Sequence, residues 1–408
     1  MARRVLLMTQ WFDPEPTFKG MTFARELRAQ GWDVDVLTGF PNYPGGKLYA
    51  GHTLKWRKRE TIDGVELTRV WLYPSHDSSK LGRIANYVSF MLSAALHGLI
   101  SVRRPDVIYS YHPPLTTAIA AIVVKFFRRA PVLIDIQDLW PDTLRATGMI
   151  GNERVLRVVN AVSNWVYRRV DHIVVLSPGF KRLLIERGVP EQKIDVIYNW
   201  ADEVALSAPT GRPPSAFPAG KFKIVFAGNM GRAQALDAVL EAASTVEAMA
   251  PQIHFLFIGG GLEVERLKAS ATSRNLHNVS FLPPVPMAEI GSYLGEADAL
   301  LVHLRRDPLF EITIPSKTQA YMASGRPILM AVAGDAARLV ELAECGVTAN
   351  PEDSQSIVQA AMKLAAASDE QRREMAFNAR RYYQDNLSVS AGVGHFSDAF
   401  KELCQRSA

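Results

Sequence analysis

The chain has 408 residues, of which 48% are hydrophobic and 21% are charged, so it is long enough for more than one core and too apolar to be disordered. Two domains are expected for this length. The two cysteines, Cys345 and Cys404, are too few for a disulfide framework and have no metal-ligand spacing, which is typical of a reducing compartment. The apolar run at the N-terminus is only about five residues long, shorter than the core of a signal peptide, so we expect a protein that is not exported.

The positive charge lies in the first half of the chain. Residues 1–205 carry 27 Lys and Arg against 20 Asp and Glu, whereas the remainder carries 19 against 21. A basic N-terminal half of this kind can bind a nucleic acid, an anionic lipid or a phosphorylated substrate. The sequence has no helix-turn-helix, zinc-finger or RNA-binding signature, so we expect no nucleic-acid partner.

Short β-branched apolar runs alternate with helical patterns along the chain, which is typical of βα units around a parallel sheet. The first half contains expected strands at residues 4–9, 33–37, 65–72, 106–110, 132–136, 171–176 and 193–198. After a segment rich in Pro and Gly, residues 207–221, the alternation restarts. The second half contains expected strands at residues 223–226, 254–258, 279–282, 299–302 and 327–332, and expected helices at 236–248 and 262–273.

These patterns predict an α/β fold with two doubly wound, Rossmann-like domains. We expect an N-terminal domain of residues 1–205, a second domain of residues 206–385, and a helical C-terminal segment, residues 386–408, that packs back on the first domain. Such sheets bind ligands at the carboxyl ends of their strands, so functional groups should lie in strand-to-helix loops that face a cleft between the domains.

Two glycine-rich turns in the second domain indicate a nucleotide site. The first follows an expected strand and contains Gly228, Asn229 and Gly231; the second contains Gly260 and Gly261. Glycine lets the backbone approach a ligand, and the helix that follows offers free N–H groups to a phosphate. A single turn of this kind is as often structural, but two in one domain favour a nucleotide.

The segment Pro315, Ser316 and Lys317 is a more specific signal. It stands just before an amphipathic helical pattern, so Lys317 and the helix N-terminus can hold a diphosphate together. Arg232 can add positive charge from the first glycine turn. The alternative is that Lys317 is a solvated surface lysine.

Five motifs resemble those of family 4 of the retaining glycosyltransferases, in the bacterial branch that builds O-antigen and colanic-acid-type polysaccharides. They are VLTGFPNYPGGKLY, VWLYPSHDSSK, DIQDLWPD, FAGNMG and IPSKTQAYMASGRPILM. The resemblance implies a GT-B fold, a UDP-sugar held by the C-terminal domain, an acceptor held by the N-terminal domain, and retention at the anomeric carbon. It also favours an N-acetylated hexosamine or deoxyhexosamine as the donor sugar.

One family feature is incomplete. The family often has two glutamates separated by seven residues, the first at the donor sugar and the second at the ribose. Glu311 can take the first role, but Gln319 or Ala320 stands at the second position, depending on the alignment. Gln319 can still form a hydrogen bond with a ribose.

Candidate acceptor residues lie in the first domain. Asp138 and Asp142 follow an expected strand, although Asp142 can equally be a helix cap. His112 ends another strand and can point into the cleft or simply stack on neighbouring rings. The resemblance implies that Lys19, Gly20 and Met21 bring backbone close to the donor phosphate and the acceptor, although Gly20 can equally serve only the start of the helix.

We expect the sugar transfer that the resemblance implies to need no metal or other cofactor. Cations and helix N-termini stabilise the charge that develops on the departing diphosphate, and no Asp-x-Asp pair stands in a loop. The candidate catalytic residues are Lys317, Glu311, Asp138 and His112. In the resembling family the departing phosphate takes the acceptor's proton, so a strong general base is not required.

Residues 84–102 contain no Asp, Glu, Lys or Arg, yet are flanked by Arg83, Arg103 and Arg104. The segment favours a helix that lies on a membrane surface rather than one that spans it, and burial in the domain core is the alternative. With the basic first half, it predicts a cytoplasmic protein on the inner face of the cell membrane, whose acceptor is a polyprenyl-diphosphate-linked saccharide. Two other functions stay open: a nucleotide-sugar epimerase or hydrolase of the same architecture, and a catalytically silent sugar-nucleotide-binding protein.

Overall fold

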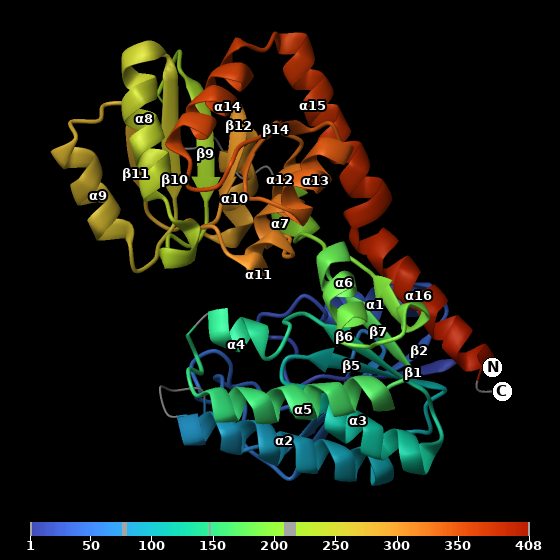
Figure 1. Ribbon diagram of the computed structural model, residues 1–408. Coiled ribbons are helices and arrows are strands. Elements are labelled where there is room, and N and C mark those ends of the chain that lie inside the picture. Colours follow the sequence, from blue (N-terminus) through green and yellow to red (C-terminus); the bar gives the residue numbers. More distant parts are fainter. Residues whose placement is uncertain (1, 76–79, 147, 208–217, 407–408) are drawn as a thin grey trace. The chain divides into compact units, whose positions relative to one another are not determined.

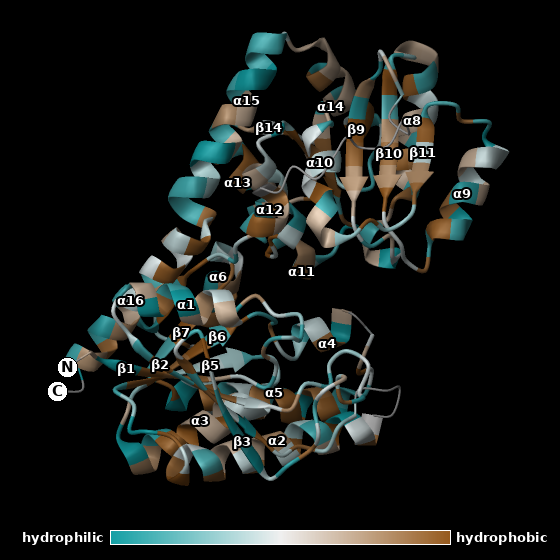
Figure 2. Cartoon of the chain, turned by 180° about the vertical axis from the view of Figure 1, so that it is seen from behind, coloured by the Kyte–Doolittle hydropathy of each residue, from teal (hydrophilic) through white to brown (hydrophobic). Residues whose placement is uncertain are grey.

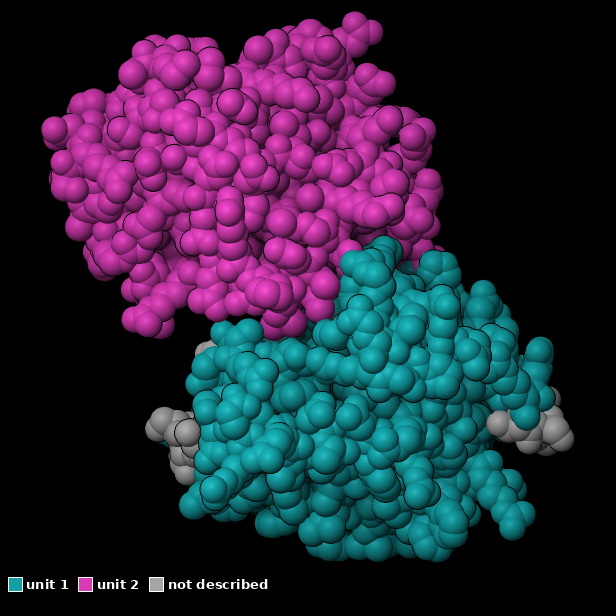
Figure 3. All heavy atoms as spheres, viewed as in Figure 1, with its two compact units in different colours: residues 1–198, 392–408 teal, residues 199–391 magenta. Residues whose placement is uncertain are grey.

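The computed structural model describes residues 2–75, 80–146, 148–207 and 218–406. The chain divides into two compact units, one of residues Met1–Tyr198 with Gly392–Ala408 and one of residues Asn199–Ala391 (Figure 3). Most of the Pro- and Gly-rich segment expected as a linker lies outside the described residues.

The first unit contains an eight-stranded sheet in the order β3-β4-β2-β1-β5-β6-β7-β8, in which only the β3–β4 pair is antiparallel (Figure 1). Its strands are β1 (Arg4–Met8), β2 (Asp33–Gly39), β3 (Arg57–Ile62), β4 (Val65–Val70), β5 (Val107–His112), β6 (Val132–Ile136), β7 (His172–Val175) and β8 (Ile194–Val196). Its helices are α1 (Met21–Ala29), α2 (Lys80–Ile100), α3 (Leu115–Arg128), α4 (Asp142–Ala146), α5 (Glu153–Arg169), α6 (Pro178–Glu186) and most of α16 (Val389–Arg406).

The central strands are buried on both sides because helices cover both faces of the sheet. All six residues of β5 and all five of β6 are buried. The C-terminal helix α16 supplies part of this core, since the ring of Phe396 lies 5.2 Å from Phe23 and 5.8 Å from Tyr109, centroid to centroid. The indole N–H of Trp32 donates to Ser397 Oγ at 2.9 Å. Residues far apart in the sequence therefore share one core.

Strand β3 was not expected from the sequence. It reads RKRETI and is mostly exposed, and it appears hydrophilic in Figure 2. An edge strand needs no apolar face, and charged residues there discourage pairing with other chains. The turn to β4 uses Asp63 and Gly64, both with positive φ, as a two-residue hairpin requires.

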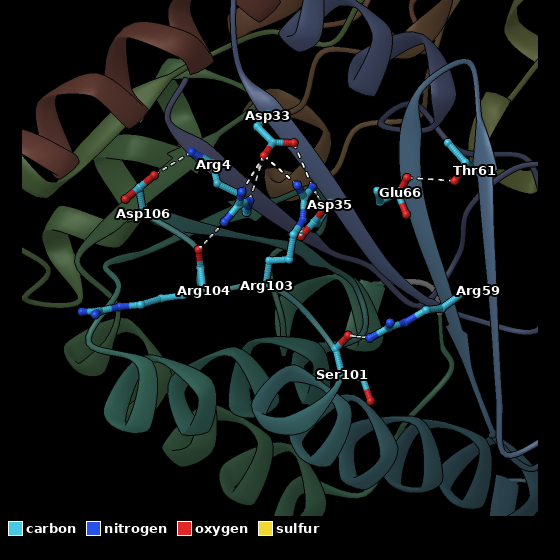
Figure 4. Close-up of polar contacts among 10 residues, drawn as sticks. All are labelled: Arg4, Asp33, Asp35, Arg59, Thr61, Glu66, Ser101, Arg103, Arg104 and Asp106. Carbon is cyan, nitrogen blue, oxygen red and sulfur yellow. Dashed lines mark hydrogen bonds and ion pairs between the residues drawn. The ribbon is translucent and has the colours of Figure 1, made fainter. Parts of the chain in front are cut away.

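Ion pairs tie the amino ends of the central strands together (Figure 4). Arg4 Nη2 lies 2.8 Å from Asp33 Oδ2, and Arg103, which follows α2, pairs with both Asp33 and Asp35. The Asp-x-Asp pair of β2 is therefore engaged by arginines at the edge of the sheet opposite to the ligand edge. The side chain of Arg103 is 45% exposed, and its guanidinium is held by these two carboxylates.

The second unit contains a six-stranded, fully parallel sheet in the order β11-β10-β9-β12-β13-β14. Its strands are β9 (Phe222–Ala227), β10 (Ile253–Ile258), β11 (Val279–Leu282), β12 (Ala299–His303), β13 (Ile328–Ala331) and β14 (Gly346–Thr348). Its helices are α7 (Glu203–Ser207), α8 (Asp237–Met249), α9 (Val264–Ser273), α10 (Ile290–Gly295), α11 (Pro308–Glu311), α12 (Ser316–Ser324), α13 (Asp335–Leu342), α14 (Ser354–Ala366) and α15 (Asp369–Tyr382). The short edge strand β14 was also missed from the sequence, because three residues carry too little periodicity.

Candidate functional site

The start of helix α12 is fixed against the end of strand β9. Pro315 precedes the helix in an extended conformation, so Ser316 and Lys317 are its first residues. One turn further on, the hydroxyl of Tyr321 accepts the Ala227 N–H at 2.8 Å and donates to the Ala227 carbonyl at 3.3 Å. These bonds hold Lys317 beside the glycine turn that follows β9.

The ammonium group of Lys317 is buried and, within the described part of the chain, has no hydrogen-bond partner. Its Nζ lies 3.3 Å from the centroid of the Phe226 ring, and a Cβ on Gly228 would stand only 2.8 Å from its Cε. Burial lowers the pKa of Lys317 to about 7. A buried cation at a helix N-terminus, with its donors unused, is arranged to receive an anion.

The two glycine turns interlock with each other. A Cβ on Gly259 would lie 2.1 Å from the Gly228 carbonyl oxygen, and one on Gly261 would lie 2.3 Å from that of Met230. The Met230 N–H donates to Gly260 O at 2.7 Å. Close approach of one loop to the other thus accounts for two of these glycines, whereas Gly228 makes room for Lys317.

A polar hollow of about 300 Å³ opens beside the first glycine turn. Charged side chains provide much of its lining, namely Arg232, Asp237, Glu263, Arg266 and Glu352. Arg232 is largely exposed, with its Nε 3.7 Å from Glu263 Oε1. Asn229 is exposed as well, and Gly231 lines the hollow.

His303 was missed by the sequence analysis, although it ends strand β12 next to these loops. Its Nδ1 lies 2.6 Å from Gln234 O, and its Nε2 accepts the Glu352 N–H at 3.1 Å. The ring therefore joins the turn after β9 to the loop after β14. Burial lowers its pKa, which favours the neutral tautomer that makes both bonds.

Glu311 and Gln319, which stand at the two positions of the incomplete glutamate pair, lie in different environments. Glu311 is exposed at the end of α11, and its carbonyl oxygen packs against Gly334, where a Cβ would be only 1.9 Å away. Gln319 is buried, and one end of its amide lies 2.9 Å from the Pro315 carbonyl oxygen and 3.1 Å from that of Ser316, so this end is assigned as the nitrogen donor. The amide nitrogen of Gln319 is thus used by its own helix.

In the first unit, Asp138 and Asp142 follow strand β6 and His112 is the last residue of strand β5, all at the carboxyl edge. Burial raises the pKa of Asp138. Burial also lowers the pKa of His112 to about 3, so this ring is neutral, and the Trp140 ring stands edge-on to it at 5.3 Å. Asp142 is the first residue of α4 and accepts a 2.7 Å hydrogen bond from Arg187, so its carboxylate is already engaged.

Lys19, Gly20 and Met21, whose backbone the resemblance places near the donor and the acceptor, lie at the start of α1. Met21 begins α1 and donates its N–H to Asp13 Oδ2 at 2.6 Å, while a Cβ on Gly20 would collide with the same carboxylate. An aspartate therefore occupies this helix start. Lys19 is buried with its Nζ 5.1 Å from the centroid of the Phe396 ring, so its ammonium group faces the core.

Two sequence families match the chain. Residues 21–200 match the Glycosyl transferase 4-like domain and residues 208–382 match Glycosyl transferases group 1. Together with two doubly wound sheets, these matches define a glycosyltransferase of the GT-B fold. The chain belongs to family 4 of these enzymes.

Named relatives and solved structures agree with this assignment. WcaI of Escherichia coli (strain K12), named for colanic acid biosynthesis, is 27% identical over 73% of this chain and 75% of its own. WbjE of Pseudomonas aeruginosa, named as a glycosyltransferase, is 25% identical over 69% of this chain and 72% of its own. HepE of Anabaena in complex with UDP and glucose is 17% identical, with a TM-score of 0.67 over 98% of this chain and all of its own. Sucrose-phosphate synthase of Thermosynechococcus elongatus is 16% identical, with a TM-score of 0.69 over 99% of this chain and all of its own.

Proposed function

We propose that this enzyme transfers a sugar from a UDP-sugar to a lipid-linked saccharide in the synthesis of a surface polysaccharide, with retention at the anomeric carbon. The donor sugar is an N-acetylated hexosamine or deoxyhexosamine, and the acceptor is carried on polyprenyl diphosphate. The structures of HepE with UDP support the nucleotide, and the name of WcaI supports the pathway class. The observation that carries the proposal is the buried, unpartnered ammonium group of Lys317 at the start of α12.

In this proposal each group of the donor site has a role. The diphosphate binds between Lys317 and the N-terminus of α12, where the ammonium group and the free N–H groups stabilise the charge that develops as the nucleotide departs. This arrangement supplies positive charge without a metal ion. Glu311 contacts the donor sugar, and the departing phosphate takes the proton of the acceptor hydroxyl.

UDP binding without divalent metal is the first test. UDP and UDP-N-acetylglucosamine, in the presence of EDTA, should raise the melting temperature, because a ligand that binds only the native state stabilises it by RT ln(1 + [L]/Kd). GDP should do so less. The absence of a shift with either UDP ligand would refute the donor site.

The affinity for UDP should also fall as the pH rises from 7 to 9. Free Lys317 loses its proton above its lowered pKa of about 7, whereas the bound diphosphate favours the protonated ammonium. Binding therefore requires proton uptake, and Kd should increase by up to about tenfold per pH unit. Calorimetry in buffers of different ionisation enthalpy measures this uptake. Lys317→Met should remove it, and a pH-independent wild-type Kd would show that Lys317 does not meet the phosphates.

We also propose that the enzyme works on the cytoplasmic face of the cell membrane. No described helix is long and apolar enough to cross a bilayer. Helix α2 nevertheless has two apolar sides: Phe90 and Ala94 are buried, whereas the opposite side exposes the large side chains of Leu81, Ile84, Val88, Leu92, Leu96 and Ile100. A helix that is apolar on all sides is usually fully buried in a protein. Because one apolar side of α2 is exposed instead, we infer that this side contacts a lipid surface.

Helices α3 and α5 extend this surface. α3 packs against both α2 and α5, and it exposes Phe126 and Phe127 at its end, while α5 exposes Val155, Val158 and Trp165. The three helices carry eight Lys and Arg but a single acidic residue, Glu153. A second copy of this face would be repelled by the like charge, whereas anionic headgroups would be attracted.

Vesicle binding tests the membrane face. The enzyme should sediment with vesicles of phosphatidylethanolamine and phosphatidylglycerol but not with pure phosphatidylcholine, and high salt should weaken the binding. Phe126→Ser with Phe127→Ser should weaken it at least about tenfold, since burying one phenyl ring contributes about 1.5–3 kcal/mol. Phe377→Ser, which changes a ring 62% exposed on α15, is the control. Equal binding of all three proteins would exclude this face.

A further inference from the structure

Two aromatic rings from different loops stack at the carboxyl edge of the first sheet. Trp11 follows β1 and Tyr43 follows β2, and their ring centroids are 4.5 Å apart with 29° between the planes. Both side chains are partly exposed. The pair therefore presents aromatic surface to a ligand rather than filling the core.

A buried carboxylate holds the two loops in this arrangement. Glu15 Oε2 accepts the Phe12 N–H at 3.1 Å, and Glu15 Oε1 accepts the N–H groups of Asn42 and Tyr43, both at 2.8 Å. One side chain thus fixes the residue next to Trp11 and the backbone of Tyr43 together. The stacked pair is positioned before any ligand arrives, which lowers the entropy lost on binding.

Asp138 lies at the same edge. Burial raises the pKa of both Tyr43 and Tyr111, and the nearby carboxylate of Asp138 adds to the rise in both, together with Asp135 in the case of Tyr111. Burial also raises the pKa of Asp138, and in the described residues no hydrogen-bond donor reaches this side chain. Its oxygens are thus available to accept hydrogen bonds from a ligand.

We propose that Trp11, Tyr43 and Asp138 form the subsite that holds the pyranose ring of the acceptor saccharide. A sugar ring has an apolar C–H face that packs on an aromatic surface, and adjacent hydroxyls that donate to a carboxylate in charge-assisted hydrogen bonds. The carboxyl groups of Asp138 and Glu15 supply no positive charge for a phosphate at this place, whether they are ionised or protonated. The subsite therefore takes a neutral sugar ring, and this assignment rests on the proposed transfer to a saccharide.

The test uses simple methyl glycosides in place of the unidentified acceptor. Saturation-transfer NMR with the methyl glycosides of N-acetylglucosamine, fucose, galactose and glucose should detect at least one binder by its ring protons. Trp11→Ala and Asp138→Asn should each weaken that binding at least tenfold. Trp56→Ala, which removes a ring 60% exposed just before strand β3, is the control and should leave it unchanged.

Failure of the proposed sugar subsite can be distinguished from failure of the proposed donor site. The melting-temperature shift with UDP should persist in Trp11→Ala and Asp138→Asn, which also shows that these variants are folded. No glycoside signal with the wild-type enzyme, or signals that survive both substitutions, would overturn the subsite. Glycoside binding without any UDP shift would instead refute the donor site and leave the subsite standing.

Discussion

Replacing Lys317 by alanine is expected to lower the rate of sugar transfer by about 10²–10³-fold, the usual cost of removing one group that stabilises developing charge. The reason is geometric: Tyr321 fixes the start of α12 on β9, so the ammonium group has one position, against Gly228 and Phe226. Release of UDP from UDP-N-acetylglucosamine, with membrane extract as the source of acceptor, measures the rate.

Two further variants sharpen this prediction. Lys317→Arg should also be impaired, because the longer guanidinium has no room beside Gly228 and Phe226, although it preserves the charge. Lys363→Ala, which removes an exposed lysine on α14, should leave the rate unchanged. Full activity in Lys317→Ala would mean that other groups carry the charge of the leaving diphosphate.

Phe396→Ala should destabilise the first unit by about 3–5 kcal/mol, the usual cost of deleting a buried phenyl ring. The ring is fully buried among Phe23, Tyr109 and Phe400, and Lys19 lies over it. Scanning calorimetry should show a lower transition temperature for the unit that contains most of α16. The transition of the second unit should stay unchanged and should still shift with UDP.

The matched substitution is Phe377→Ala on α15, where the ring is 62% exposed. It should change stability by less than about 0.5 kcal/mol, as surface substitutions usually do. Equal stability of the two variants would contradict the packing of α16 in the core of the first unit.

The sequence predicted the sheets well, because buried parallel strands are continuous apolar runs. All the expected strands are present, and β11 agrees residue for residue. The two missed strands, β3 and β14, are edge strands whose short or polar sequences carry no such signal. The family resemblance, from its motifs, was confirmed.

The site was less predictable, because its features depend on side-chain direction and on contacts between loops. The side chain of Lys19 points into the core, which the sequence did not indicate because no periodicity reports the direction of a loop side chain. The expected approach of this loop's backbone to the donor and the acceptor stays a prediction. The glycines of the second turn fit a phosphate loop equally well on sequence, but the structure uses Gly259 and Gly261 to pack one turn on another. Trp11 and His303 belong to none of the quoted motifs, and Tyr43 lies within one whose spacing does not reveal its ring contact. Their contacts join loops that are distant in the chain.

The placement of α16 has a consequence for biosynthesis. Phe396 and Ser397 complete a core whose other members, such as Phe23, Trp32 and Tyr109, leave the ribosome hundreds of residues earlier. Domains usually fold in the order in which they are synthesised. Here the second unit is fully made before the first unit receives its last helix, so the domain translated first is the last to reach its final packing. Until α16 is made, the groove that it fills is exposed apolar surface, which a chaperone can cover. Once α16 is made, the helix itself covers this groove.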